Sequence, residues 1–185
     1  MKKSHRKGLL DVSRWAIEYY LERKENPSLE VIENIVKKFP IELISVIGVA
    51  VILVSHHKNS YGKIRGVHIL FSTEPMVVQL VSASINAAFF DPKTPRLKRH
   101  EINEIDPHII LISQKKEGIS GKDELWGAEY RGRNALILPY ELEELETEEQ
   151  KKTLLRLRLG LHKEPKEGDI ELFGYKYEES VNKGG

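Results

Sequence analysis

Two neighbouring stretches decide the fold of this chain: the apolar run Ile47-Gly48-Val49-Ala50-Val51-Ile52-Leu53-Val54, and Lys63-Ile64-Arg65-Gly66-Val67-His68 after a short turn. The first is rich in β-branched residues, which is typical of a strand covered on both faces. Turn-forming residues fill positions 58–62, so we expect residues 63–71 to return as the second strand of a hairpin. A turn centred on Ser60 would pair His68 with Ile52.

Arg65 and Gly66 form the most informative pair in this hairpin. The guanidinium is always charged and offers five donors in a rigid fork. A glycine in a strand lets another backbone or a ligand approach closely. The pair therefore has two readings: an anion clamp, or a structural arginine that pairs with a buried carboxylate beside a bulge glycine.

Helical periodicity predicts three helices in the first half of the chain, at about residues 8–24, 29–39 and 74–91. Further strands are expected at 109–112, on both sides of 131–134, and at 169–177, and Thr147–Gln150 has the capping-box pattern of a late helix. Hairpins mix with helices and no βαβ rhythm recurs. This order predicts an α+β fold, with a mixed or antiparallel sheet and flanking helices.

Length and composition indicate one globular domain, and we expect flexible tails at 1–7 and 179–185. The 185 residues carry a net charge of +1, so total charge does not predict binding to nucleic acid or to anionic membranes. There are no cysteines, which excludes disulfides and thiolate chemistry. No signal peptide is recognisable, and the longest apolar run is shorter than a membrane span, so we expect a cytoplasmic protein.

Metal and cofactor motifs are absent from the sequence. His56 and His57 are adjacent, and adjacent strand residues point to opposite faces, so they do not form a chelating pair. No H-x-x-x-H pattern, Walker A motif or G-x-G-x-x-G motif occurs. We predict no metal site and no cofactor.

Several polar residues near the hairpin are candidates for a site. Asn86 is a polar residue in an apolar helix, and Asp91 follows at its end, either as a cap or as a partner of Arg65. Asp91 and Glu74 are also the weak candidates for catalytic carboxylates, with His68 as a further acid or base. In a regular strand Arg65 and His68 lie on opposite faces, and a bulge at Gly66 would be needed to bring them together.

Two basic segments invite a nucleic-acid hypothesis, Lys93–His100 and Arg131–Arg133. The first lacks the interleaved aromatic residues of single-strand binders. Gly118–Gly121 imitates the GXXG loop of KH domains, but such a short match arises easily by chance. Solvated loops are the simpler interpretation of all three segments.

Taken together, Ile64–Ile69, Glu74-Pro75, Asn86–Pro92 and Ile137–Pro139 resemble, in order and spacing, the motifs of the AMMECR-type domain family, named for the AMME-syndrome candidate gene. The best-known motif of that family is Leu-Arg-Gly-Cys-Ile-Gly. Here Val67 stands in the place of the cysteine and the second glycine is missing. A family function that needs the thiol is therefore lost in this chain, whereas one that needs the arginine and the glycine is retained.

The resemblance covers about residues 8–178 and implies a larger and a smaller subdomain, with the Arg-Gly motif near the cleft between them. We expect a cleft-binding module that recognises an anionic small molecule or a protein partner segment through Arg65-Gly66, with Asn86 and Asp91 as further ligand-binding residues. Two alternatives stay open. One is an enzyme with carboxylate acid/base chemistry in the same cleft, and the other is nucleic-acid binding through residues 93–100.

Overall fold

A computed structural model of the chain describes residues 1–56, 63–119, 124–161 and 170–181. The predicted turn at 58–62, His57 and the second half of Gly118–Gly121 lie outside these residues. The helical elements and strands have these bounds: α1 Lys3–Arg23, α2 Leu29–Val36, β1 Gly48–Ser55, β2 Lys63–Phe71, α3 Met76–Phe89, η1 Arg99–Glu104, β3 Ile105–Glu117, β4 Glu124–Tyr130, β5 Arg133–Leu136, α4 Pro139–Leu142, α5 Glu148–Arg158 and β6 Glu171–Ser180.

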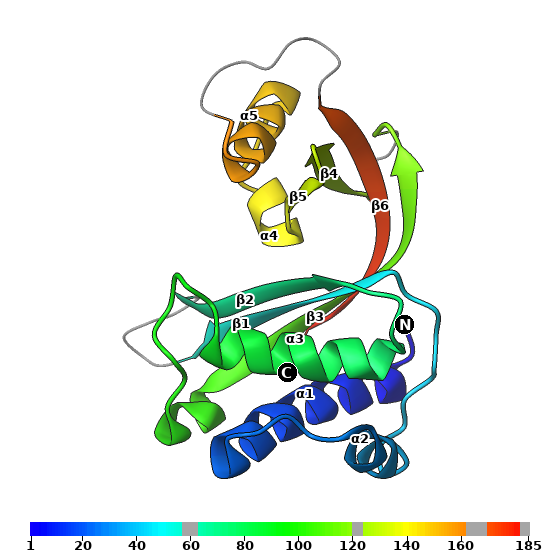
Figure 1. Cartoon of the computed structure of the whole chain (residues 1–185), viewed down its shortest axis with the longest axis vertical. Helices are drawn as coiled ribbons and strands as arrows, with labels where there is room; N and C mark the ends of the chain where they lie inside the picture. The colour runs from blue at the N-terminus through cyan, green and yellow to red at the C-terminus, as the bar shows by residue number, and fades with distance from the viewer. Residues whose placement is uncertain (57–62, 120–123, 162–169, 182–185) are drawn as a thin grey trace. The chain divides into compact units, whose positions relative to one another are not determined.

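The described strands belong to one six-stranded sheet, hydrogen-bonded in the order β2-β1-β3-β6-β4-β5. β1 is antiparallel to both β2 and β3, and β4 is antiparallel to both β5 and β6. Helices flank this sheet, so the predicted α+β class is confirmed (Figure 1). Among the described strands β2 lies at an edge, so one side of its backbone has no neighbouring strand there.

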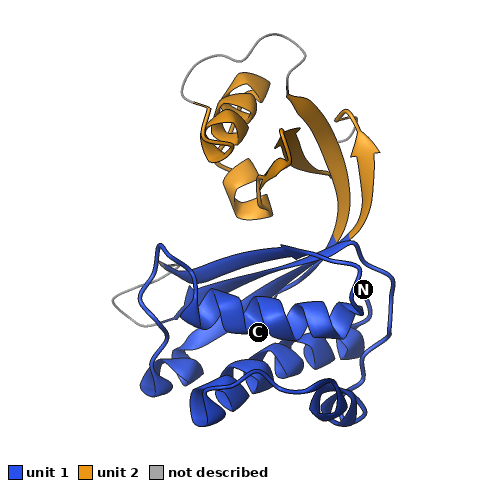
Figure 2. Ribbon diagram, in the orientation of Figure 1, with its two compact units in different colours: residues 1–112, 178–185 blue, residues 113–177 orange. Residues whose placement is uncertain are grey.

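The chain divides into two compact units, a larger and a smaller one (Figure 2). Unit 1 comprises residues 1–112 and 178–185, and unit 2 comprises residues 113–177. The family resemblance predicted such a pair, although the sequence itself gave little evidence of a boundary. The boundary crosses β3 and β6, and no loop or linker marks it in the sequence.

In unit 1, helices α1 and α3 pack on one face of β1, β2 and the first part of β3 (Figure 1). Val49, Val51 and Leu53 of β1 point into this core, which explains why so apolar a strand forms here. The hydroxyls of Ser13 in α1 and Ser84 in α3 are both fully buried and lie 2.8 Å apart. This hydrogen bond fixes the position of one helix relative to the other.

In unit 2, helix α5 covers the β4–β5 hairpin. Its core includes Trp126, Ala135, Ile137, Leu155 and Leu159. The predicted capping box is confirmed, because the Thr147 hydroxyl accepts from the Gln150 amide and the Gln150 side chain accepts from the Thr147 amide. Helix α4 was not expected, since its four residues are too few to show a helical period.

Several predicted boundaries were wrong. Helix α1 begins at Lys3, so residues 3–7, expected in a tail, form its first turns, and His5 there is 3% exposed. β6 continues to Ser180, whose buried hydroxyl donates to the Arg6 carbonyl. Helix α2 ends at Val36 and β3 extends well beyond 109–112 on both sides. Tertiary contacts hold residues whose own sequence shows no clear periodicity.

Candidate functional site

A bulge in β2 sets the geometry around Arg65. Leu53 pairs with Gly66 and Val54 pairs with Ile64, so Arg65 is left without a cross-strand partner. The expected pairing of His68 with Ile52 was wrong by one residue, because His68 pairs with Val51. An extra residue in one strand changes the alternation of side chains. Gly66 and His68 consequently share the face of Leu53 and Val51, which packs under α3.

Gly66 is where β2 meets the end of α3. A Cβ atom on this residue would lie 1.9 Å from the carbonyl oxygen of Ala87. The neighbour is helix backbone, which cannot rotate away as a side chain can. Only glycine therefore fits, and its close approach is to α3 of the same chain.

Asp91 fastens the loop after α3 to the edge strand. One carboxylate oxygen accepts from the Val67 amide at 2.8 Å, and the other accepts from the Lys93 amide at 2.8 Å. The Val67 N–H belongs to an edge strand, where an unpaired donor would invite pairing with another chain. Asp91 thus acts as a loop-ordering carboxylate, with both of its oxygens already engaged.

Arg65 forms an ion pair with Glu101 of η1. Its Nε and one terminal nitrogen donate to Oε1 of Glu101, at 2.9 and 2.6 Å. The second carboxylate oxygen accepts from the Lys98 amide at 2.8 Å, which caps η1. The Arg65 and Glu101 side chains are only 13% and 20% exposed. An anionic ligand at Arg65 would have to compete with this internal carboxylate.

Electrostatics around Glu101 favour its ionised form. Burial disfavours the charge, but the Lys98 amide and the Arg65 guanidinium outweigh it, and the pKa of Glu101 lies below its ordinary value. The pair therefore stays charged near neutral pH. This is the arrangement expected of a structural arginine, the second of the two readings of the Arg-Gly pair.

His68 and Asn86 meet on the α3 side of β2, with His68 Nε2 3.3 Å from Asn86 Nδ2. Burial lowers the pKa of His68, and the nearby Asp91 opposes that shift only in part. His68 is thus held neutral under α3 while Arg65 reaches η1. The bulge does break the alternation between the two residues, yet no hydrogen bond joins them in the described part of the chain.

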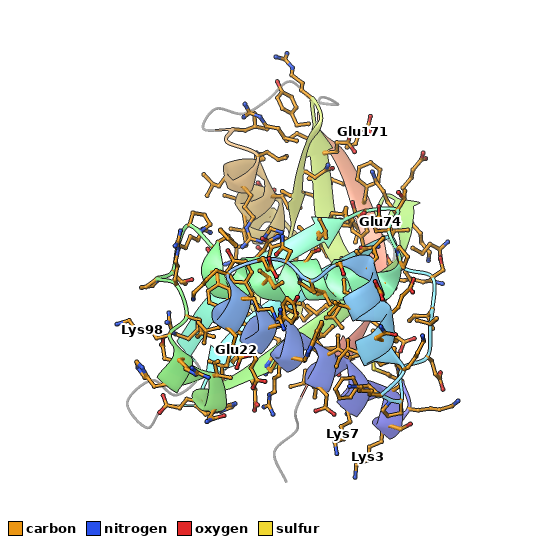
Figure 3. The ribbon with its side chains drawn as sticks, turned by 60° about the horizontal axis from the view of Figure 1, so that its bottom comes forward. Lys3, Lys7, Glu22, Glu74, Lys98 and Glu171 are labelled. Carbon is orange, nitrogen blue, oxygen red and sulfur yellow. The ribbon has the colours of Figure 1, made fainter. Side chains whose placement is uncertain are left out.

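Glu74 lies far from this corner of unit 1. It precedes α3, whereas Asp91 follows it, and a helix of 14 residues is about 21 Å long. Figure 3 shows Glu74 and Lys98 on opposite sides of the unit. Asp91 and Glu74 therefore do not form a carboxylate pair around one substrate, and the geometry offers no support for acid/base chemistry by the two together.

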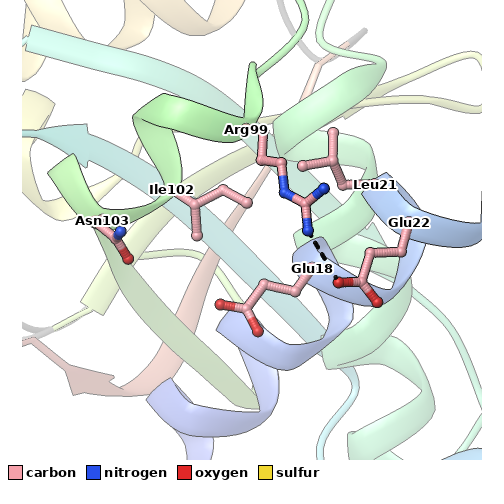
Figure 4. A pocket seen from close by; sticks show the side chains of 6 residues that line it. All are labelled: Glu18, Leu21, Glu22, Arg99, Ile102 and Asn103. Carbon is pink, nitrogen blue, oxygen red and sulfur yellow. Dashed lines mark hydrogen bonds and ion pairs between the residues drawn. The ribbon is translucent and has the colours of Figure 1, made fainter.

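Beside η1, on the side of α1, is a groove of about 340 Å³ (Figure 4). Glu18, Leu21 and Glu22 of α1 line it together with Arg99, Ile102 and Asn103 of η1. Arg99 lies 3.5 Å from Glu22, and both side chains are largely exposed. Glu101 is an immediate neighbour in sequence of Ile102, so the Arg65–Glu101 pair holds the η1 wall of the groove.

Sequence reasoning did not identify this groove. Glu18 and Glu22 are four residues apart on α1, a spacing that puts both carboxylates on one face of the helix. The sequence shows this spacing of glutamates, but a helix face exposed to solvent has the same spacing of charged residues. Only the packing of η1 beside α1 turns the two glutamates into one wall of a concavity.

The histidines and basic segments also have defined places. His56 Nε2 lies 2.6 Å from Asp106, and the described residues contain no cluster of metal-ligating side chains. Arg131 lies over the Tyr130 ring, and Arg133 donates to the Leu159 carbonyl. These two arginines therefore have partners within unit 2, which fits a turn better than a phosphate-binding surface.

Comparison with known proteins gives two findings. A model of the AMMECR1 family matches residues 10–180. The crystal structure of the uncharacterised protein PH0010 from Pyrococcus horikoshii is similar, with a TM-score of 0.78 and 21% sequence identity over 97% of this chain and 92% of that one. At this identity the likeness concerns the fold alone. No curated protein matches the chain. Among the described residues, no helix has both the length and the apolar character needed to cross a membrane.

Proposed function

This chain belongs to the AMMECR1 family, and we propose that it is a binding module whose α1–η1 groove takes a basic side chain from a segment of a protein partner. We still expect the ligand to be a segment of a protein partner, but the group that the protein recognises is a cation and not an anion. The observation that carries it is the pair of carboxylates, Glu18 and Glu22, on one wall of a groove that also contains apolar side chains.

The lining matches the chemistry of an arginine or lysine side chain. Such side chains have an aliphatic stem and a cationic head, and they bury the stem while keeping the head near polar groups. Leu21 and Ile102 offer the stem an apolar surface, and Ile102 is 9% exposed. Glu18 and Glu22 offer the head two carboxylates. The Glu18 carboxylate has no ion-pair partner among the described residues.

The size of the groove agrees with one side chain. A volume of about 340 Å³ is at the lower end of the range for small-molecule sites, roughly 300–1,000 Å³. A peptide side chain with its neighbouring backbone fits this space better than a large cofactor. Asn103 beside it supplies an amide that can donate to, or accept from, the peptide backbone.

In the free protein Arg99 contacts the carboxylate of Glu22 in the groove, and a basic side chain of the ligand can replace it there. Its pair with Glu22 joins side chains that are 79% and 60% exposed, at 3.5 Å. Exposed pairs of this kind contribute about 0–1 kcal/mol, so an incoming cation displaces Arg99 at little cost. Arg65 has the opposite character, since it is largely shielded from solvent and holds η1 through Glu101. It is a positioning residue for the groove and does not contact the ligand in this proposal.

Titration of ¹⁵N-labelled protein with the tripeptide acetyl-Gly-Arg-Gly-amide tests the proposal. We expect saturable shifts of the Leu21, Ile102 and Asn103 amides, with a Kd on the order of 1 mM, as suits a single side chain. The glutamine tripeptide should give no saturable shift. The double variant Glu18→Gln/Glu22→Gln should lose binding of the arginine tripeptide by about tenfold or more.

A matched control removes two exposed carboxylates elsewhere. Glu30→Gln/Glu33→Gln on α2 changes the net charge equally and should bind as the parent does. Equal loss in both double variants would mean that only overall charge matters and would refute the groove. Binding of acetyl-Gly-Glu-Gly-amide in preference to the arginine tripeptide would restore the anionic ligand.

A further inference from the structure

We propose that a second surface of unit 1, formed by Phe90 and the cations of residues 93–98, binds single-stranded nucleic acid. This Phe90 surface consists of Phe90, Lys93, Arg96 and Lys98. It is separate in its side chains from the α1–η1 groove and goes beyond the function proposed above. The basic segment contains no aromatic residue of its own, and Phe90 precedes it at the end of the apolar helix.

Phe90 is exposed although it belongs to an otherwise buried helix end. Its side chain is 49% exposed, whereas Phe89 beside it is 7% exposed. Tyr20 contacts the Phe90 ring in a T-shaped arrangement, with the ring centroids 5.7 Å apart and the planes at 76°. Tyr20 itself stacks against Phe89 at 4.9 Å. An exposed aromatic ring that a neighbouring ring holds in place can stack a nucleobase.

Arg96 adds a cation to this ring. Its guanidinium carbon lies 5.9 Å from the centroid of Phe90. Lys93, Arg96 and Lys98 are exposed and form no ion pair within the described residues, and no acidic residue interrupts positions 92–100. An exposed aromatic ring with one cation over it and two exposed lysines nearby in sequence suits a ligand that presents phosphates and bases alternately.

The loop that carries these cations is held in place at both ends. The carboxylate of Asp91 accepts from the Lys93 amide, and the Leu97 amide donates to the Ala88 carbonyl at 2.8 Å. The Leu97 side chain is 3% exposed, and the Lys98 amide donates to Glu101. Ordering this loop on binding therefore costs little, because it is ordered beforehand.

The ligand class follows from the ring. Bases in a duplex are stacked on one another and do not offer a free face to Phe90, whereas an unpaired base does. The net charge of +1 gives the whole protein no general attraction to polyanions. Affinity for a single strand therefore depends on the local cations and on stacking.

Fluorescence anisotropy with labelled dT12 and rU12 oligonucleotides at 25 mM salt, and then at rising salt, tests the proposal. At least one of the two oligonucleotides should bind, and comparing their affinities shows whether the surface prefers DNA or RNA. Phe90→Ala should weaken binding about tenfold, through the loss of one stacked base. Arg96→Gln/Lys98→Gln should reduce the slope of log affinity against log salt by about 1.4, at roughly 0.7 per phosphate contact.

Matched controls separate this surface from general effects. Lys37→Gln/Lys38→Gln removes two exposed charges at the end of α2. Leu157→Ala removes an apolar side chain of α5 that is 54% exposed. Both should bind as the parent does. Absence of binding at 25 mM salt, unchanged affinity in Phe90→Ala, or equal affinity for a 12-base-pair duplex would overturn the proposal. The groove variants Glu18→Gln/Glu22→Gln should retain oligonucleotide binding, so the two proposals can fail independently.

Discussion

At the scale of single residues, the Arg-Gly pair has two separate structural tasks. Gly66 allows β2 to touch the backbone of α3, and Arg65 binds the carboxylate that caps η1. The sequence indicated that both residues were unusual, and it left the choice between an anion clamp and an internal ion pair open. The position of Glu101, 36 residues further along the chain, favours the internal ion pair.

Gly66→Ala provides a direct test of the close approach. The added Cβ would overlap the Ala87 carbonyl, so strand and helix must separate and core contacts are lost. We expect a loss of about 3 kcal/mol or more in the free energy of unfolding, measured by urea denaturation. Gly132→Ala is the control, since that residue has a φ of 76° and open space around it, and should lose only about 1 kcal/mol through backbone strain. A smaller loss at Gly66 than at Gly132 would contradict the account.

At the scale of elements, the sequence predicted the strands and helices well where periodicity was strong and poorly where tertiary contacts decide. Helix α3 and the β1–β2 hairpin follow from apolar pattern and turn residues. The sequence allowed a bulge beside Gly66 but could not require one, because a one-residue shift leaves the composition of the strand unchanged. That shift moves His68 opposite Val51 and sets the whole register of the site.

The groove illustrates the same limit for elements that pack against one another. Glu18 and Glu22 have a helical spacing that the sequence displays, whereas Arg99 and Asn103 come from η1, far along the chain. Their approach depends on how η1 is held, through Glu101 to β2 and through Ile102 to the core. Contacts between residues so far apart in sequence have no local pattern.

At the scale of the whole molecule, one buried and two partly buried histidines should make stability depend on pH. Burial lowers the pKa of His5, His68 and His108 in the folded protein. The unfolded chain then binds more protons than the folded one between the ordinary histidine pKa and the lowered values, so stability falls as the pH falls below about 6.5. We expect urea midpoints that decrease from pH 7 to 5.5, with a shallower decrease in His68→Asn. A midpoint that rises over this range would contradict these shifts.

The central claim concerns the ion pair by which Arg65 holds η1, and a double-mutant cycle on unfolding free energy tests it most directly. Arg65→Gln and Glu101→Gln should each cost about 2 kcal/mol, because each leaves a partly buried group unpaired. The double variant should cost little more than either single one, which gives a coupling energy of about 1–3 kcal/mol. Additive losses, with a coupling energy near zero, would show that Arg65 does not depend on Glu101 and would contradict the account.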